Sequence, residues 1–394
     1  MPGQAAPTSK YRFPWRQGNR LRLLIDGGEF YPRMLEAIAG ARRYILLEMY
    51  LFESGLVASD FITALTSAAA RGVRVHLLLD DYGAMRLTRR DRQRLTDAGV
   101  ALAFYNPIRV GRIQRSLFRD HRKLLLIDGE TAYTGGAGIT DEFDPKLYPA
   151  SHWHELMVEI RGPNVLDWQI LFKDNWMHWA PDPLHLPAAP APQATGGWLG
   201  RVTSSRSPVR SEIARSFVRR IRYAERRAWL ATAYFAPSRK LRRALRRAAR
   251  RGVDVRVMLP GPHTDHGWVR TIGRRYYARL LRAGVRIFEY QPRFLHVKLA
   301  LCDQWSSVGS SNVDRWNLRW NLEANQEVDD SEFADEVQAL FERDLHNCRE
   351  FHYHQWLRRP WYRRLKEWSL GYLARALAWF SYKKHRPSRR DPPL

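Results

Sequence analysis

The sequence predicts an α/β protein built from two copies of one unit, which form a bilobed molecule with pseudo-twofold symmetry. Apolar strand-like runs alternate with helical stretches, and this order is typical of a sheet covered by helices. Segments 68–79 and 248–259 each show a helix end, a Gly stop and a short β-branched strand. The Ala-Gly-Val runs at 98–100 and 283–285 both lead to a strand that ends in Tyr-x-Pro. We therefore expect each copy to hold a mixed, mostly parallel β-sheet flanked by helices.

The repeat divides the chain into regions of different character. Five prolines lie between residues 181 and 192, and they indicate a linker or an irregular crossing segment between the copies. A twofold arrangement also predicts a site at the interface of the two copies. The expected regions are repeat 1 at 15–177, the Pro-rich linker at 178–205, repeat 2 at 206–350 and a basic, Trp-rich C-terminal segment at 351–394.

The composition is that of a globular protein with a large excess of positive charge. Hydrophobic residues make up 45% and charged residues 27% of the chain, and the formal net charge is +25. This charge predicts a partner rich in negative charge: nucleic acid, an anionic membrane surface or a phosphorylated substrate. Two cysteines, Cys302 and Cys348, exclude a disulfide framework and a Cys-rich metal site, and they favour a reducing cytoplasm.

The hydropathy pattern contains no membrane-crossing signal. Residues 1–20 are polar and basic, and no window approaches eighteen uninterrupted apolar residues. We therefore expect neither a signal peptide nor a conventional membrane span, and a protein that is soluble or peripheral.

Both copies carry the same chemical motif at the same place. The first reads His121-x-Lys123 with Asp128 five residues after the lysine, and the second reads His296-x-Lys298 with Asp303 at the same spacing. Residues two apart in a strand face the same side, so His and Lys of each pair project together. Small residues follow both motifs, and they include Gly136 in copy one and Ser310 and Asn312 in copy two.

This set of residues suits phosphoryl transfer at a phosphodiester. Two lysines neutralise the non-bridging oxygens, and Gly, Ser and Asn offer backbone N–H groups and amide donors to the same oxygens. One imidazole attacks phosphorus as a nucleophile while the other protonates the departing alkoxide. Because the lysines supply the positive charge, we expect no metal and no cofactor.

The double motif resembles that of the phospholipase D superfamily. The resemblance extends to the bacterial cardiolipin synthases, most closely to the short type, cardiolipin synthase B, which lacks two N-terminal membrane spans. It covers the chain from about Trp15 to Asp329. The stretches that carry it are His121-Arg-Lys-Leu-Leu-Leu-Ile-Asp-Gly129, Ala132-Tyr-Thr-Gly-Gly136, Val308-Gly-Ser-Ser-Asn312 and Asn321-Leu-Glu-Ala-Asn325.

The resemblance implies roles for these residues. His121 is expected to be the nucleophile and His296 the general acid, although the sequence itself fits either assignment. Each imidazole needs a carboxylate to fix its tautomer, and the strands that follow the motifs offer Glu155 and Glu323. Asp128 and Asp303 lie near strand ends, where they anchor a loop or touch substrate. Family members usually carry Asn where this chain has Gly138.

Other residues near the motifs are weaker candidates. Asp265 and His266 follow the strand at 253–259, where either a substrate headgroup or solvent would surround them, and Asp80, Asp81 and Tyr82 occupy the corresponding place in copy one. Copy one also has about ten extra residues at 110–119, in which Arg alternates with Ile, Leu and Phe. That segment fits a membrane interface or a solvated basic loop.

The C-terminal segment favours a membrane as the anionic partner. Between 355 and 394 it holds eleven Lys/Arg, and aromatic residues recur there at helical spacing from Trp361 to Trp379. Packing on the protein's own core is the alternative for this helix, and basic aromatic patches also bind single-stranded nucleic acid. The expected function is phosphatidyl transfer through a phosphohistidine, from phosphatidylglycerol or phosphatidylethanolamine to phosphatidylglycerol, on the cytoplasmic face of the bacterial plasma membrane. A hydrolase or a nuclease of the same superfamily is the alternative, no nucleic acid partner is expected, and oligomeric state stays open.

Overall fold

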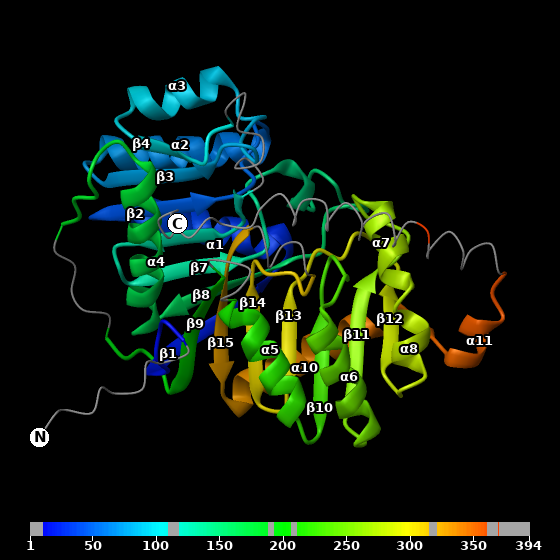
Figure 1. Ribbon diagram of the computed structural model, residues 1–394. Helices are drawn as coiled ribbons and strands as arrows, with labels where there is room; N and C mark the ends of the chain where they lie inside the picture. The colour runs from blue at the N-terminus through cyan, green and yellow to red at the C-terminus, as the bar shows by residue number, and fades with distance from the viewer. Residues whose placement is uncertain are drawn as a thin grey trace, which may run out of the picture.

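The computed structural model describes residues 11–108, 118–187, 193–205, 211–314, 321–360 and 369 (Figure 1). Two expected features lie outside these residues: most of the 110–119 insertion, and the C-terminal segment beyond residue 360 except Ser369. Of the helices that the structure describes, none is long and apolar enough to cross a membrane.

The first repeat runs from strand β1 to helix α4. Its strands are β1 (Arg16–Ile25), β2 (Tyr44–Met49), β3 (Arg74–Asp80), β4 (Ala101–Tyr105), β5 (Arg119–Asp120), β6 (Lys123–Ile127), β7 (Thr131–Gly135) and β8 (Leu156–Arg161). Its helices are α1 (Asp26–Gly40), α2 (Leu56–Ala70), α3 (Arg89–Asp97) and α4 (Asn164–Trp179), with the 3-10 turn η2 at Asp141–Phe143.

The second repeat follows a similar order, with two helices before β12 where repeat 1 has α3, and with β16 and α11 added after α10. Its strands are β9 (Trp198–Ser205), β10 (Arg227–Ala231), β11 (Asp254–Pro260), β12 (Arg286–Tyr290), β13 (Leu299–Cys302), β14 (Trp305–Gly309), β15 (Asn321–Asp329) and β16 (Cys348–Phe351). Its helices are α5 (Glu212–Tyr223), α6 (Arg239–Arg250), α7 (Gly267–Arg274), α8 (Tyr277–Leu281), α10 (Ser331–Leu345) and α11 (Tyr353–Leu357).

One continuous sheet passes through both repeats. Its order is β16-β12-β11-β10-β13-β14-β15-β9-β1-β8-β7-β6-β2-β3-β4, and β1 pairs antiparallel with β9 at its centre. The order outward from β1 matches the order outward from β9, so the expected pseudo-twofold relation is present. The α/β class and the two flanked repeats are confirmed.

Two details differ from the sequence-based expectation. Among the described strands, those that pair in parallel within a repeat are β2-β3-β4 and β10-β11-β12, whereas the motif strands β6 and β13 pair antiparallel with both neighbours. Each motif strand turns directly into the next strand, at Asp128–Gly129 and at Asp303–Gln304, so its pairing with β7 or β14 is that of a hairpin and not of a helical crossover. The end of the expected linker, Trp198–Ser205, forms the mostly buried central strand β9. Its Gly and Ser content is not typical of a buried strand, so the sequence did not predict it.

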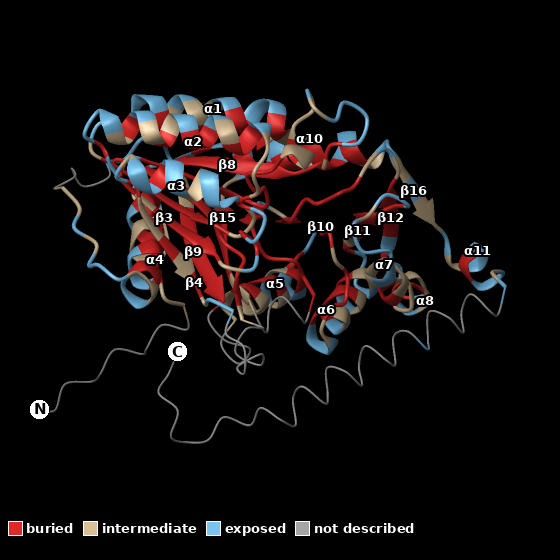
Figure 2. Cartoon of the chain, turned by 90° about the horizontal axis from the view of Figure 1, so that it is seen from above, coloured by how far each residue is buried: buried red, intermediate tan, exposed pale blue. Residues whose placement is uncertain are grey.

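Helices cover both faces of the sheet. In Figure 2, α1 and α2 lie on the same side as α10, while α4 lies on the side of α5 and α6. Helices α2 and α6 end in the same way, because Gly72 and Gly252 adopt φ values of 88° and 90° that an L-residue rarely tolerates. The repeated Arg-Gly-Val pattern therefore encodes one helix stop twice.

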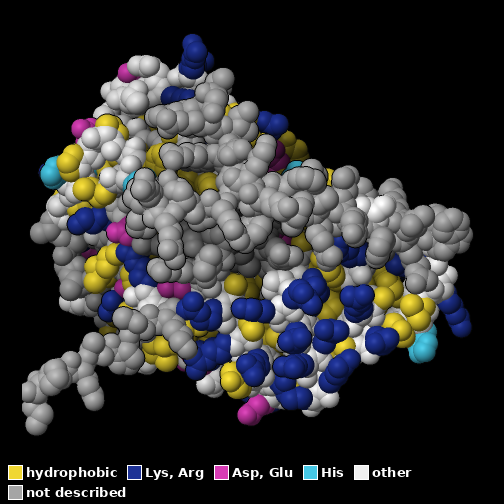
Figure 3. All heavy atoms as spheres, in the orientation of Figure 1, with side chains coloured by type: hydrophobic (Ala, Val, Ile, Leu, Met, Phe, Trp, Pro, Cys, Tyr) yellow, Lys and Arg dark blue, Asp and Glu magenta, His cyan; other side chains and the backbone are white. Residues whose placement is uncertain are grey.

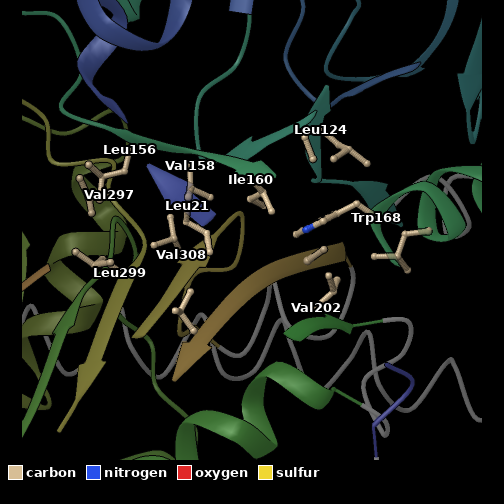
Figure 4. Close-up of a cluster of buried hydrophobic side chains, with 14 of the residues drawn as sticks. Leu21, Leu124, Leu156, Val158, Ile160, Trp168, Val202, Val297, Leu299 and Val308 are labelled. Atoms are coloured by element: carbon tan, nitrogen blue, oxygen red, sulfur yellow. The ribbon is translucent and has the colours of Figure 1, made fainter. Parts of the chain in front are cut away.

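A shared core joins the two repeats. Leu21 and Val158 from repeat 1 pack with Val202, Val297 and Val308 from repeat 2 in one buried cluster (Figure 4). Because this core is common to both halves, the strand ends that carry the two motifs are held in a fixed relation.

Candidate active site

The two motifs enter one site, and each pairs through its backbone with the other repeat. His121 lies between β5 and β6, and its N–H donates to the carbonyl of Leu322 at 3.0 Å. His296 lies three residues before β13, and its N–H donates to the carbonyl of His154 at 2.8 Å. Equivalent backbone hydrogen bonds therefore join the two repeats at both motif histidines.

The carboxylates that orient the imidazoles are exchanged between repeats. His121 Nδ1 lies 3.1 and 3.2 Å from the two carboxylate oxygens of Glu323. His296 Nδ1 lies 2.5 Å from Oε2 of Glu155. A carboxylate at Nδ1 holds the proton there and leaves Nε2 free to act on phosphorus or on a leaving oxygen. The sequence offered both glutamates but not this exchange of partners.

The motif lysines are buried beside these pairs. Lys123 Nζ donates to the carbonyl of His121 at 2.7 Å and lies 4.9 Å from the ring centre of Tyr50. Lys298 Nζ lies 2.9 Å from Oε2 of Glu155. Burial lowers the pKa of Lys123 to about 7 and lowers the pKa of Lys298 as well. Such lysines gain most from an anion that enters the site, because it restores the charge that burial disfavours.

Burial also lowers the pKa of both motif histidines. For His121 the negative charge of Glu323 opposes this effect, and for His296 burial and the charge of Lys298 lower the pKa to about 4. The rings of Phe143, Trp153 and Phe294 surround His296, with centroid distances of 5.8, 5.1 and 5.5 Å. Both imidazoles are therefore neutral in the empty site at neutral pH, as a nitrogen nucleophile must be.

Small residues after the motifs leave room for the carboxylates and offer hydrogen-bond donors. A Cβ at Gly136 would lie 2.0 Å from Oε2 of Glu155, so only glycine fits there. The equivalent residue Ser310 donates its hydroxyl to Glu323. Oδ1 of Asn312 accepts from the Thr232 hydroxyl and from the N–H of Tyr234, while its buried Nδ2 has no partner among the described residues. That amide is a free donor at the motif strand ends.

Gly138 takes the place of a second such amide for a steric reason. A Cβ at Gly138 would lie 2.7 Å from Cβ of Leu51 and 2.9 Å from its carbonyl oxygen. The backbone here packs too closely to Leu51 for any side chain. The site is therefore asymmetric, with the amide donor on the side of repeat 2.

The two motif aspartates lie apart from this chemistry. Asp128 and Asp303 occupy the far ends of β6 and β13, where both adopt positive φ values of 54° and 53°. The carboxylate of Asp128 accepts from the backbone N–H groups of residues 42–44, and that of Asp303 accepts from those of residues 225–227. Of the two alternatives that the sequence left open, loop anchoring is what the structure shows, because each carboxylate accepts from three backbone N–H groups of the loop that leads into β2 or β10.

The weaker candidates divide into residues that border the site and residues that support the chain leading into the first motif. Tyr234 donates its hydroxyl to Asp265 and stacks with His266 at 6.0 Å, and its ring lies 6.4 Å from that of His296, so these residues border the site. Asp80 instead accepts from the N–H of Asp120 at 2.8 Å and pairs with Arg119, which positions the entry to the first motif. Asp81 accepts from the N–H of Ile108, and the Tyr82 side chain is exposed.

A buried ionic cluster, which the sequence did not predict, lies next to Glu155. His154 lies 2.8 Å from Asp26 through Nδ1 and 2.9 Å from Asp344 through Nε2, and Arg293 pairs with Asp26. Asp26 also accepts from the N–H of Glu155 at 3.1 Å and donates its own N–H to that residue's carbonyl at 2.9 Å. The cluster therefore fixes the Glu155 backbone and joins both repeats. Only its adjacency to Glu155 in the sequence signals it.

Replacing either orienting glutamate by glutamine should slow turnover of a phosphodiester substrate. Glu323→Gln and Glu155→Gln each keep the shape but remove the charge that stabilises an imidazolium, so we expect kcat to fall about 10²–10⁴-fold. Steady-state kinetics on correctly folded protein measures this. The matched control is Glu327→Gln, on the same strand as Glu323 and paired with Arg201 at 2.6 Å. It should lower the melting temperature and leave kcat near that of wild type; equal kcat losses in all three variants would contradict the orienting role.

The His154 cluster should make stability fall at alkaline pH. Burial opposes protonation, but Asp26 and Asp344 outweigh it and raise the pKa of His154 to about 9, above its ordinary 6.5. For such a shift the protonated imidazole adds about 3 kcal/mol to the free energy of unfolding. This stabilisation is complete below pH 6.5 and is lost as pH rises through 9. Melting temperatures between pH 6.5 and 9.5 should converge for wild type and His154→Gln. A gap that stays constant across this range would show that the imidazole is uncharged in the folded protein.

Comparisons with known proteins agree with the geometry. A family model described as the phospholipase D-like domain of cardiolipin synthase matches residues 34–173 and 217–345. Cardiolipin synthase A of Pseudomonas aeruginosa is 34% identical over 346 residues, which cover 86% of this chain and 70% of the relative. Cardiolipin synthase B of Salmonella typhimurium is 33% identical over 393 residues, which cover 95% and 90%.

Solved structures share the fold at low sequence identity. Phosphatidylserine synthase of Haemophilus influenzae superposes with a TM-score of 0.71 at 14% identity, covering 91% of this chain and 93% of its own. Polyphosphate kinase of Porphyromonas gingivalis superposes with a TM-score of 0.60 at 15% identity, covering 85% and 49%. With both motifs in one site and these relatives over most of its length, the chain belongs to the cardiolipin synthase family of phospholipase D-like enzymes.

Proposed function

We propose that this enzyme makes cardiolipin by transferring a phosphatidyl group from one phospholipid to the glycerol hydroxyl of phosphatidylglycerol. The donor is phosphatidylglycerol, or alternatively phosphatidylethanolamine. The observation that carries the proposal is the pair of His–Glu units, each built from both repeats, with two buried lysines beside them. Membership of the cardiolipin synthase family supplies the lipid substrate class.

The first half-reaction forms a phosphohistidine. Nε2 of His121 attacks phosphorus, the bond from phosphorus to the headgroup oxygen breaks, and His296 gives its proton to that oxygen. Glu323 stabilises the positive charge that develops on the imidazole of His121. In the second half-reaction His296 takes the proton of the acceptor hydroxyl, whose oxygen attacks phosphorus as the P–N bond breaks. His296 thus loses a proton in the first half-reaction and regains one in the second, so the enzyme returns to its starting protonation state.

The bound phosphate itself makes His296 an acid. Burial and Lys298 lower the pKa of His296 in the empty site, whereas a phosphodiester anion and Glu155 favour the protonated imidazole. Lys123, Lys298 and the free Nδ2 of Asn312 bind the non-bridging oxygens. Because the lysines neutralise this charge, the proposed reaction requires no metal ion.

The substrate places the enzyme at a membrane. We propose peripheral attachment to the cytoplasmic face of the bacterial plasma membrane, with anionic phospholipid as partner. The support for this is the net charge of +25 and the basic, aromatic composition of residues 351–394.

A leaving group that departs without a proton should distinguish the two histidines. On a phosphatidyl p-nitrophenyl ester, His296→Ala should release about one nitrophenolate per enzyme in a burst and then stall, because only the second step still needs a base. His121→Ala should release none, since it cannot form the covalent intermediate. Stopped-flow absorbance reads the burst, and both variants should still bind liposomes. A burst in His121→Ala but not in His296→Ala would reverse the assignment.

Product analysis tests the reaction itself. The purified enzyme, incubated with phosphatidylglycerol liposomes with and without phosphatidylethanolamine, should yield cardiolipin with released glycerol or ethanolamine in mass spectra. The yield should be the same when EDTA is present. Phosphatidic acid alone would identify a hydrolase, and cleavage of single-stranded DNA without lipid turnover would identify a nuclease. Loss of the product with EDTA would contradict the metal-independent mechanism.

A further inference from the structure

The helices of the second repeat carry a dense positive face that includes none of the motif residues. Lys and Arg side chains gather over α5, α6 and α8 in Figure 3. Helix α6 has seven basic residues among twelve and no acidic residue. Its buried positions, from Leu241 to Ala248, recur at helical spacing and face the core. The remaining face of α6 is therefore almost entirely positive.

The first repeat provides an internal comparison. Helix α2 holds the position equivalent to α6, since each joins a strand to its parallel neighbour. In α2 there is no Lys or Arg, and Asp60 is its single charged residue. The fold therefore does not need positive charge at this place. Since like charges on one helix repel one another, the concentration of charge on α6 calls for an anionic partner.

A groove between α6 and α8 concentrates this charge. It has a volume of about 320 Å³, and none of its described lining residues is acidic. Arg242 is held in place, because its guanidinium lies 4.4 Å from the ring centre of Tyr276 and donates to the carbonyl of Pro237 at 2.7 Å. Arg246 donates to the carbonyl of Arg242 at 3.3 Å. The groove is lined by Arg239, Lys240, Arg242, Arg243, Arg246, Tyr276, Arg279 and Leu280.

The groove is coupled to the active site through the start of α6. Tyr234, which borders the site, lies four residues before the Ser238 that caps α6. Pro237 pairs with Asp314, two residues beyond Asn312. A surface bound at Arg239 and Lys240 therefore lies at the same end of the sheet as the reacting histidines.

We propose that the α6–α8 face docks the enzyme on anionic phospholipid, with the groove holding the headgroup phosphates of lipids that are not being turned over. This inference rests on the proposed lipid substrate. Of the two repeats, it assigns membrane contact to repeat 2, in addition to the contact proposed for residues 351–394, and thereby fixes which way the active site faces the bilayer. Guanidinium groups bind phosphate bidentately, and a groove with several of them fits clustered headgroups better than an isolated ion.

Neutralising the exposed groove residues tests the proposal. The triple variant Lys240→Gln, Arg243→Gln, Arg279→Gln in the full chain should bind phosphatidylglycerol vesicles about 100-fold more weakly, since each basic residue near an anionic surface contributes roughly 1 kcal/mol. Co-sedimentation at fixed salt measures the affinity. The matched control is Arg89→Gln, Arg90→Gln, Arg94→Gln on α3, where three exposed arginines of repeat 1 are removed. That control should bind nearly as wild type does.

Two further measurements separate the possible failures. Turnover of a monomeric short-chain phosphatidylglycerol should be unchanged in the groove variant, because no motif residue is altered.

Equal vesicle affinity in the groove variant and wild type, or an equal loss in the α3 control, would overturn the docking face even if lipid turnover is normal. Loss of affinity for a single-stranded oligonucleotide without loss for vesicles would assign the face to nucleic acid instead. Vesicle binding through the groove without turnover of any lipid would overturn the proposed reaction and not the docking face.

Discussion

The exchange of carboxylates between the repeats is the constraint on which the active site depends. Glu323 orients His121 and Glu155 orients His296, so neither repeat holds a complete catalytic unit. The same crossing occurs in the backbone, at Leu322 and at His154. A site built this way needs the two halves in a fixed relation, which explains the continuous sheet through β1 and β9 and the shared core.

Symmetry in the scaffold coexists with asymmetry in the chemistry. His296 lies among aromatic rings, and its Glu155 also contacts Lys298, whereas Glu323 beside His121 accepts from Ser310. Among the described residues at the motif strand ends, Asn312 of repeat 2 offers an amide donor, whereas Leu51 closes the equivalent space at Gly138. Two equivalent imidazoles thus have different surroundings, as a division between nucleophile and acid requires.

The sequence predicted what is local and repeated. The Gly stops, the apolar strands and the paired His-x-Lys motifs follow from spacing along the chain, and the structure has them where expected. The sequence did not predict the features that depend on long-range packing: the partner of each glutamate, the cluster around His154 and the burial of β9. Asp128 illustrates the limit, because its motif position indicated catalysis while its positive φ and three backbone donors, set by the fold, make it an anchor.

The buried charges explain why the site favours an anionic diester. Two lysines and two glutamates lie together out of water, and burial lowers the pKa of both lysines despite the neighbouring carboxylates. Separating such charges from solvent costs free energy that their mutual attraction does not fully recover. A phosphodiester that enters between the lysines supplies the missing negative charge and also favours protonated His296. Binding energy is therefore used to create the acid, so that the proton is available only when a substrate phosphate is present.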